Sequence, residues 1–291
     1  MIHRLPLSQR ALHGYFSRDL EPVLTIEPGD SVRFSIPNSS WYVEPEKKFV
    51  SRDPTLDIGH ALAGPIAVRG ARVDQTLVVR IDEVRPASWG VTYTQPPHLI
   101  RWQLADGVGR GAGQEVHLAP FLGVLGMPPA DPGVHSTIPP RRCGGNIDCK
   151  ELVAGATLFL PISVDDALFS AGDGHAAQGD GEISGTAIEC PVEAQLTIDV
   201  RKDFPIEWPV ARTATSWLTF GFHENLREAA RIAVEGMLDL MQREHGLARN
   251  DALALGSVVV DLRVTQIANK TLGVHAVLRD AALEKSIRAP L

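Results

Sequence analysis

The chain has 291 residues and a formal net charge of −7, from 35 acidic and 28 basic side chains. This acidic balance argues against nucleic-acid binding, which needs clustered Lys and Arg, and no apolar run approaches the roughly 18 residues of a membrane helix. The first residues lack the apolar core of a secretory signal, and three cysteines are too few for a disulfide scaffold. We therefore expect a cytoplasmic protein that binds neither nucleic acid nor membranes.

The first two thirds of the chain contain short runs with the near-alternating pattern of half-buried strands. In the clearest run, Leu77, Val79 and Ile81 are separated by single residues that include Arg80. Glycines and prolines between the runs indicate turns. The predicted strand regions are 22–36, 64–84, 156–162, 181–190 and 192–201.

Residues 86–140 show no clear period and contain several Pro-Pro and glycine-rich tracts. So long an irregular stretch in a compact protein is typical of functional loops, and we predict loops here. His98 and His117 lie in this region; they, like His60, receive no role from the pattern.

The composition changes after about residue 212, where helical periodicity begins. The predicted elements are a helix at 223–246 ending at Gly246, a short helix and a strand within 247–267, and a strand at 273–280. We therefore predict a mainly β fold, with a β-rich catalytic body over 1–212 and a small α+β subdomain over 213–291 packed against it.

The segment 168–182 concentrates acidic groups and one histidine among glycines. Asp173 and His175 are two residues apart, and so are Asp180 and Glu182, so each pair shares a face of an extended chain. Glycine permits tight turns and close backbone approach, which would let the two pairs converge.

This set of groups has two chemical uses. A carboxylate beside a histidine can position and deprotonate water, and the same oxygen and nitrogen atoms can hold a divalent metal. The alternative is a solvated acidic turn with an incidental histidine. The density of ionisable groups in so few residues favours a catalytic or metal site.

A second polar segment, residues 139–149, places Asn146 and Asp148 two residues apart after a Gly-Gly turn. On its own, this pattern is as well explained by side chains that cap local backbone groups.

The cysteines and the nucleotide motifs offer little support for other chemistries. Cys143 and Cys149 are farther apart than the usual zinc-binding pair. A cysteine nucleophile with Lys150 and Glu151 would suit a nitrilase-like amide hydrolase, but adjacency in sequence is not catalytic geometry. The chain has no P-loop and no dinucleotide-binding glycine motif between a strand and a helix, so we expect no nucleotide cofactor.

Four segments, in the same order along the chain, resemble the acetamidase/formamidase family. The most specific are Gly-Gly-Asn-Ile-Asp at 144–148 and the glycine-rich acidic run at 172–182. The chain departs from the family pattern at His60, Ala63 and Val73, and the change at Ala63 bears on the exact substrate. The matching segments are 64–84, 121–129 leading into 143–162, 167–189 and 251–278.

The resemblance implies hydrolysis of a short aliphatic amide, formamide or acetamide, to ammonia and a carboxylate. It also implies a β-sandwich or jelly-roll-like body, homo-oligomeric assembly, and a divalent metal, zinc or calcium, as the candidate cofactor. The family's polar motif positions fall on Asn146, Asp148, Asp173, His175, Gln178, Asp180 and Glu182.

Amide hydrolysis needs an activated water, a stabilised oxyanion and a proton for the leaving nitrogen. We assign water activation to Asp173 and His175, either directly or as ligands of a metal that Asp180 also holds. Glu182 or Asp148 would carry the proton to the nitrogen. The predicted substrate-binding residues are Gly145, Asn146 and Gln178.

Two other functions stay open. One is hydrolysis of a different C–N or ester bond in the same pocket, and the other is a non-catalytic binding protein on the same scaffold. The acidic segment argues against the second, because a scaffold does not need four carboxylates and a histidine beside tight turns. The expected partners are a small amide and further copies of this chain.

Overall fold

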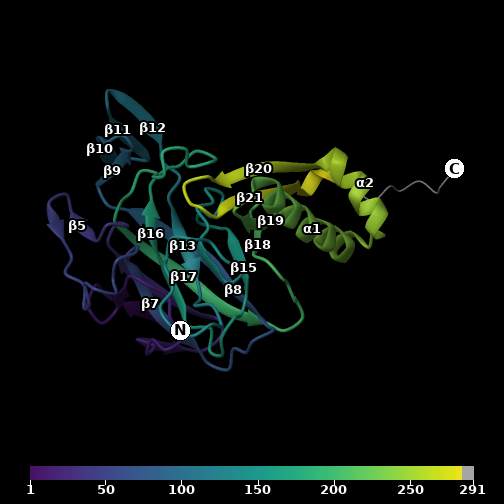
Figure 1. Ribbon diagram of the computed structural model, residues 1–291, viewed down its shortest axis with the longest axis horizontal. Coiled ribbons are helices and arrows are strands. Elements are labelled where there is room, and N and C mark those ends of the chain that lie inside the picture. The colour runs from purple at the N-terminus through teal and green to yellow at the C-terminus, as the bar shows by residue number, and fades with distance from the viewer. Residues whose placement is uncertain (284–291) are drawn as a thin grey trace.

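The computed structural model describes residues 1–283, so the last eight residues of the predicted C-terminal subdomain, 284–291, lie outside the described residues. Figure 1 shows a β-rich body with two helices at one end. The nine-stranded sheet contains, in spatial order, β1 (Ile2–Leu5), β4 (Asp30–Ile36), β17 (Val192–Arg201), β8 (Thr76–Pro86), β15 (Thr157–Pro161), β18 (Val210–Arg212), β19 (Ser216–His223), β21 (Leu272–Arg279) and β20 (Val260–Gln266).

A second sheet carries the polar motifs. Its strands are β14 (Gly144–Asn146), β13 (Phe121–Gly126), β16 (Phe169–His175), β7 (Leu62–Val68) and β2 (Leu12–His13), with β3 (Leu24–Ile26) also paired to β7. The remaining strands form a four-stranded sheet of β9 (Trp89–Thr94), β10 (His98–Ala105), β11 (Val108–Gly111) and β12 (Gln114–His117), and a pair of β5 (Tyr42–Glu44) and β6 (Lys47–Lys48).

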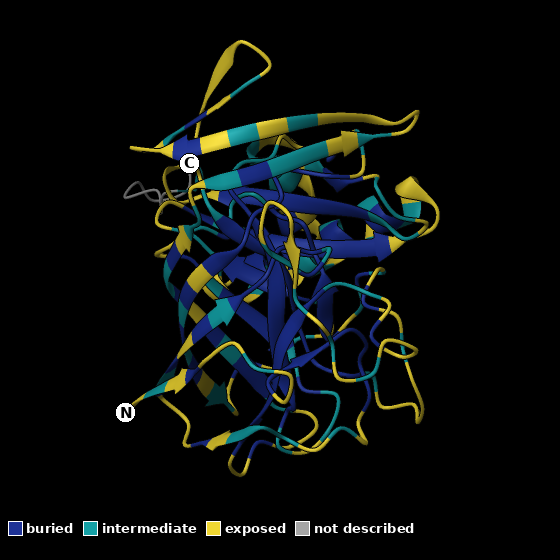
Figure 2. Ribbon diagram, turned by 90° about the vertical axis from the view of Figure 1, so that its left-hand side faces the viewer, coloured by how far each residue is buried: buried dark blue, intermediate teal, exposed yellow. Residues whose placement is uncertain are grey.

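The main core lies between the two larger sheets. β4 and β17 alternate buried and more exposed residues, as expected for strands with one face on the core. β7, β13 and β16 are buried along their whole length, which Figure 2 shows as a dark blue centre. The predicted mainly β fold is confirmed, and the polar motifs lie inside this buried layer.

The C-terminal helices cover one end of the nine-stranded sheet. α1 (Leu226–His245) packs on β19 and β21 and is followed by α2 (Arg249–Val259) and a short 3₁₀ turn at Asp280–Ala282. The Asn225 side chain accepts hydrogen bonds from two N-terminal backbone amides of α1. The helix ends at Gly246, which adopts the left-handed conformation at φ 69°. The nine-stranded sheet contains strands from both sides of the predicted subdomain boundary at residue 212, because β18 pairs with β19. A separate apolar cluster lies beneath the helices. Within residues 1–283, none of the helices has the length and apolar character needed to cross a membrane.

Two regional predictions were wrong. Residues 89–126 contain β9 to β13 rather than irregular loops, because the proline and glycine tracts there occupy turns between short strands, whereas residues 127–140 are irregular as predicted. Residues 181–190 form isolated bridges rather than a strand. The backbone cannot stay extended there, because Gly181, Glu182 and Gly185 all have positive φ.

The glycine-rich motif also differs from a surface turn. β16 is a buried strand between β13 and β7. A Cβ on Gly172 would lie 2.4 Å from the Ala61 carbonyl oxygen, and one on Gly174 would lie 2.4 Å from Val192. These glycines therefore allow neighbouring segments to pack closely against the strand that carries Asp173 and His175.

Candidate active site

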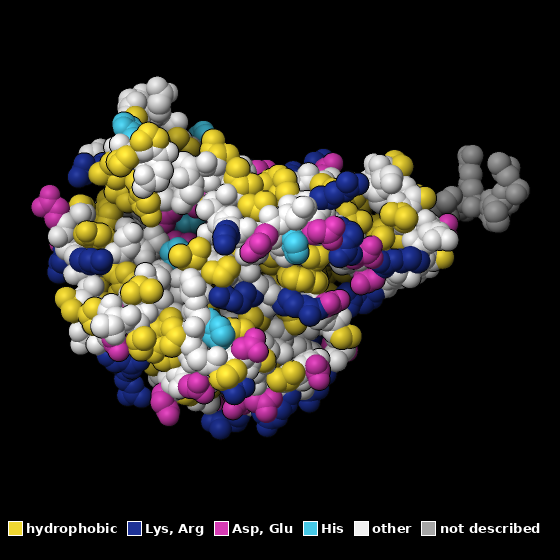
Figure 3. Space-filling model, in the orientation of Figure 1, with side chains coloured by type: hydrophobic (Ala, Val, Ile, Leu, Met, Phe, Trp, Pro, Cys, Tyr) yellow, Lys and Arg dark blue, Asp and Glu magenta, His cyan; other side chains and the backbone are white. Residues whose placement is uncertain are grey.

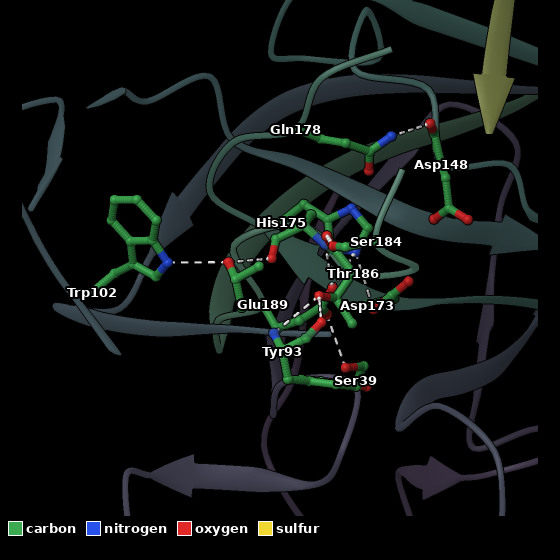
Figure 4. A network of polar contacts seen from close by, with 12 residues as sticks. Ser39, Tyr93, Trp102, Asp148, Asp173, His175, Gln178, Ser184, Thr186 and Glu189 are labelled. Carbon is green, nitrogen blue, oxygen red and sulfur yellow. Dashed lines mark hydrogen bonds and ion pairs between the residues drawn. The ribbon is translucent and has the colours of Figure 1, made fainter. Parts of the chain in front are cut away.

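Five ionisable side chains from four segments converge at β16. Figure 4 shows four of them, Asp148, Asp173, His175 and Glu189. Asp173 and His175 come from β16 itself, and the Nε2 atom of His175 lies 3.3 Å from Oδ1 of Asp173. The Oε1 atom of Glu189 lies 3.2 Å from the same nitrogen. Asp148 follows β14, and Glu182 lies in the turn region after β16; these two form a second close group with His175.

The cluster is buried. The five residues are 1–7% exposed. Both carboxylate oxygens of Asp148, Oδ1 of Asp173 and both ring nitrogens of His175 make no hydrogen bond within the described part of the chain. Buried polar atoms normally have partners, so these atoms have capacity to bind a substrate, water or a cation.

Three of the cluster residues have unusual backbone conformations. Asp148, Asp173 and Glu182 have φ values of 52°, 61° and 42°, in the left-handed region that residues other than glycine rarely adopt. Such conformations cost roughly 1–3 kcal/mol each and concentrate at functional sites. All three carboxylates are buried, and this concentration of strained backbone in one cluster supports a functional role for it.

Gly123 of β13 forms part of the wall of the cluster. A Cβ at this position would lie 2.5 Å from Oδ2 of Asp173, 2.6 Å from Oδ1 of Asp148 and 2.9 Å from Cε1 of His175. The absent side chain therefore provides the space in which the carboxylates and the imidazole meet.

Electrostatic attraction shifts the pKa values of Asp173 and His175. Burial alone would lower the pKa of His175, but Glu189 and Asp173 raise that pKa well above its ordinary value. Burial would raise the pKa of Asp173, but the neighbouring His175 and His60 hold it below its usual range. The imidazolium and the Asp173 carboxylate thus stabilise each other's charged forms.

The pKa values of Asp148 and Glu182 are raised, whereas that of Asp173 is lowered. Burial, reinforced by the charge of Glu182, raises the pKa of Asp148 well above its usual range. Burial also raises the pKa of Glu182 to about 8. At neutral pH the site therefore combines an ionised carboxylate with carboxyl groups that still carry protons, the pairing used for acid–base catalysis.

Sequence reasoning missed Glu189. Its side chain accepts hydrogen bonds from the Ser39 hydroxyl at 2.8 Å and from the Ala187 amide at 3.0 Å. The available signal was a single acid between apolar residues at the end of 186–190. Its position beside His175 depends on backbone bridges to His175 and Val91, which no local pattern reveals.

The other predicted site residues lie at different distances from the cluster. Asp180 is not part of it: this exposed residue forms an ion pair with Lys150 at 3.1 Å. Gln178 donates from Nε2 to the backbone oxygen of Asp148 at 2.7 Å, so it supports that residue. Asn146 is buried, with an unpartnered Oδ1 among the described residues, and Gly145 precedes it in the β13–β14 ladder.

A pocket of about 630 Å³ adjoins the cluster. Two of its lining residues act on the acids: the Ser39 hydroxyl donates to Glu189, and the charge of His60 helps to lower the pKa of Asp173. A third, Tyr93, has a pKa raised by burial and by the charge of Glu189. Figure 3 shows this face hollowed, with histidine and acidic atoms visible inside the hollow. His98 and His117 are exposed on β10 and β12 and do not line the pocket.

Comparisons with known proteins agree on one family. The model of the Acetamidase/Formamidase family matches residues 3–98 and 125–271. The acetamidase of Mycolicibacterium smegmatis is 38% identical over 96 residues, which are 29% of this chain and 24% of that protein. The formamidase of Methylophilus methylotrophus is 43% identical over 68 residues, which are 23% of this chain and 17% of that protein. These aligned stretches therefore span a quarter or less of the two curated relatives.

A solved structure extends the similarity to nearly the whole chain. The acetamidase from Bacillus halodurans is 27% identical, with a TM-score of 0.86, and the match covers 95% of this chain and 97% of that one. The shared fold therefore includes both the sheet that carries the cluster and the C-terminal helices.

Proposed function

Because this chain belongs to the acetamidase/formamidase family, we propose that it hydrolyses short aliphatic amides, formamide or acetamide, to a carboxylate and ammonia. The observation that carries the proposal is the buried group of Asp173, His175 and Glu189, placed beside Asp148 and Glu182 and next to a pocket. This arrangement supplies a base, a proton donor and a place for a small uncharged substrate.

The proposed roles follow from position and charge. Asp173 and Glu189 both lie within 3.3 Å of Nε2 of His175 and stabilise its protonated form. His175 positions the attacking water, and the ionised Asp173 accepts the proton of that water. Glu182, protonated at neutral pH, gives its proton to the leaving nitrogen, and Asp148 beside it is the second proton carrier. Asn146 binds the substrate carbonyl, while Gln178 holds the backbone of Asp148 in place.

The donor set also fits a divalent cation. Asp173, His175 and Glu189 offer three ligand atoms within 4.8 Å of one another, and Oδ1 of Asp173 has no hydrogen-bond partner in residues 1–283. We propose that these three residues hold zinc or calcium, with Glu189 in the position that sequence reasoning gave to Asp180. Binding would displace the proton that His175 carries in the metal-free site and release it to solvent. A bound cation would lower the pKa of a coordinated water and polarise the amide carbonyl.

Removal of the cation should lower activity. We expect dialysis of the purified protein against a chelator to reduce kcat/KM for acetamide at least tenfold, with recovery when zinc or calcium is returned. Elemental analysis before and after dialysis measures the metal content. Full activity in protein that contains no metal would contradict the cation proposal and leave the carboxylate–histidine group acting alone.

Glu182→Gln should lower kcat about hundredfold, because glutamine cannot supply the proton that the leaving nitrogen needs. In the wild type, kcat should fall as the pH rises through about 8, where Glu182 loses its proton. The substitution should preserve the thermal unfolding midpoint at pH 7, since both side chains are uncharged there. A pH–rate profile measures both effects.

Glu193→Gln is the matched control for this substitution, because Glu193 is an exposed residue of β17. It should leave both kcat and the pH profile unchanged. A Glu182→Gln enzyme with normal kcat would remove Glu182 from the mechanism.

The substrate class is tested by ammonia release from formamide, acetamide, propionamide and urea, together with the matching methyl esters. We expect formamide and acetamide to give the highest kcat/KM. Faster turnover of the esters or of urea would contradict the proposed substrate class and indicate hydrolysis of a different bond.

We further propose that the enzyme is a cytoplasmic homo-oligomer that acts on a small amide. The three cysteines are free and buried, which suits a reducing compartment. Size-exclusion chromatography with light scattering measures the assembly, and a monomer across the micromolar range would contradict it.

A further inference from the structure

A second group of metal-ligating atoms lies where the segment after β14 meets β21. The Sγ atom of Cys149 lies 3.2 Å from Oε2 of Glu151, and Nε2 of His275 lies 3.6 Å from the same oxygen. All three ligand atoms are within 4.8 Å of one another. Cys149 and His275 are buried, whereas Glu151 is half-buried. These residues are separate from those assigned to amide hydrolysis.

The separations between these atoms match one tetrahedral zinc ion. Zinc bonds of about 2.3 Å to sulfur and about 2.1 Å to oxygen or nitrogen place sulfur and oxygen about 3.6 Å apart and nitrogen and oxygen about 3.4 Å apart. The observed values of 3.2 Å and 3.6 Å are close to these. Side-chain adjustments of a few tenths of an ångström therefore suffice to bring the three atoms around one ion.

Neighbouring residues orient two of the ligands. Nδ1 of His275 is hydrogen-bonded to the Thr265 hydroxyl at 2.8 Å. The imidazole can donate from Nδ1, which leaves the lone pair of Nε2 directed at Glu151. Arg263 donates to Oε1 of Glu151 at 2.7 Å and leaves Oε2 to face Cys149 and His275. These are the outer contacts that fix ligands in protein zinc sites.

His275 provides an independent observation, a buried ring nitrogen with free capacity to bind a ligand. Its ring is fully buried, and Nε2 has no hydrogen-bond partner among residues 1–283. A hydrogen bond from the Cys149 thiol to Glu151 would satisfy those two residues but would leave this nitrogen unpartnered.

The charges and the access route are compatible with a cation. A thiolate and a carboxylate together cancel the charge of Zn²⁺, while Arg263 remains on the outer oxygen of Glu151. Nearby Lys150 is paired with Asp180. A pocket of about 390 Å³ is lined by both Glu151 and Arg263, which gives the ion a path from solvent.

We propose that Cys149, Glu151 and His275 bind Zn²⁺ at a second site, structural in role, with water as the fourth ligand. Binding exchanges the proton of the Cys149 thiol for the metal and releases that proton to solvent. Cys149 directly follows Asp148, so the ion would fasten the segment carrying that active-site residue to β21.

The test uses cobalt as a spectroscopic substitute for zinc. Metal-free wild-type protein is titrated with Co²⁺, and the near-ultraviolet thiolate-to-cobalt charge-transfer band is recorded together with proton release. We expect a band that saturates at one equivalent for this site and is abolished by excess Zn²⁺. The active-site cluster contains no thiol ligand, so it gives no such band.

Variants assign the band to its residue. Cys149→Ser should abolish it and weaken zinc binding at this site at least hundredfold in a competition with a chromophoric chelator. Cys143→Ser and Cys190→Ser are matched controls, since both cysteines are also free and buried, and they should retain the band. Asp173→Asn should retain the band while losing acetamide hydrolysis, which separates this site from the proposed amidase function.

Two results would overturn the proposal. One is the absence of a thiolate band in folded wild-type protein, a result that does not depend on how any variant folds. The other is a band that persists in Cys149→Ser. A normal band in a protein that does not hydrolyse any amide would contradict only the proposed function.

Discussion

His175→Ala should lower kcat/KM for acetamide at least hundredfold, because His175 is the group that both Asp173 and Glu189 contact at the centre of the cluster. A hundredfold loss corresponds to about 2.7 kcal/mol of transition-state stabilisation. Steady-state ammonia release measures the effect. The variant also leaves two buried carboxylates without their cationic partner, so its thermal unfolding midpoint should fall as well.

His98→Ala is the control for this substitution, because His98 is exposed on β10. It should change neither activity nor stability. His175→Gln serves as a second variant that retains more side-chain volume. Wild-type turnover in a folded His175→Gln protein would contradict the role assigned to the histidine.

Gly123→Ala should also lower kcat/KM at least hundredfold, although it adds one methyl group to a residue with no acid–base chemistry. The methyl carbon would lie within 3 Å of Asp173, Asp148 and His175 and would force the acids apart. Overpacking of this kind costs about 1–3 kcal/mol in stability, which a folded domain of this size normally tolerates. The measurement is kcat/KM together with a thermal melt.

Gly179→Ala provides the matched comparison. A Cβ on Gly179 meets nothing within 4 Å, and the residue has no positive φ to strain. This variant should keep activity within about twofold of wild type. Equal activity in the two alanine variants would show that the close contacts at Gly123 do not define the site.

The elements that could be predicted from sequence are those specified by local patterns. α1 was predicted at 223–246 and spans Leu226–His245, because its apolar period, the Asn225 cap and Gly246 all lie within the segment. β17 was predicted at 192–201 and has those bounds, since its alternation reflects one face on the core. Both patterns lie within a single segment, so they can be recognised without knowing the fold.

The strands between residues 86 and 140 could not be read in the same way. β10 and β12 are mostly exposed or half-buried, so they lack a clear apolar alternation. They are strands because they pair with their neighbours across hairpin turns, a stabilisation that comes from partners and not from composition.

The candidate site also combines residues that local patterns predict with residues that only long-range pairing brings together. The spacing of Asp173 and His175 predicted that they lie together, and the structure brings them within 3.3 Å, although Asp173 at φ 61° departs from the extended backbone that the prediction assumed. Glu189 could not be found, because it reaches His175 through long-range pairing. The spacing of Asp180 and Glu182 was misleading: the positive φ of Glu182 breaks the extended geometry, so one acid is exposed and the other buried.

The central claim is that the buried acid–histidine cluster hydrolyses a small amide. The most direct measurement follows carbon-labelled acetamide by NMR in the presence of purified wild-type and His175→Gln protein, with ammonia assayed in the same samples. We predict that the wild type forms acetate and ammonium in equal amounts and that the variant forms neither at a comparable rate. Equal product formation by both proteins, or unchanged acetamide with folded, metal-loaded wild type, would contradict the account.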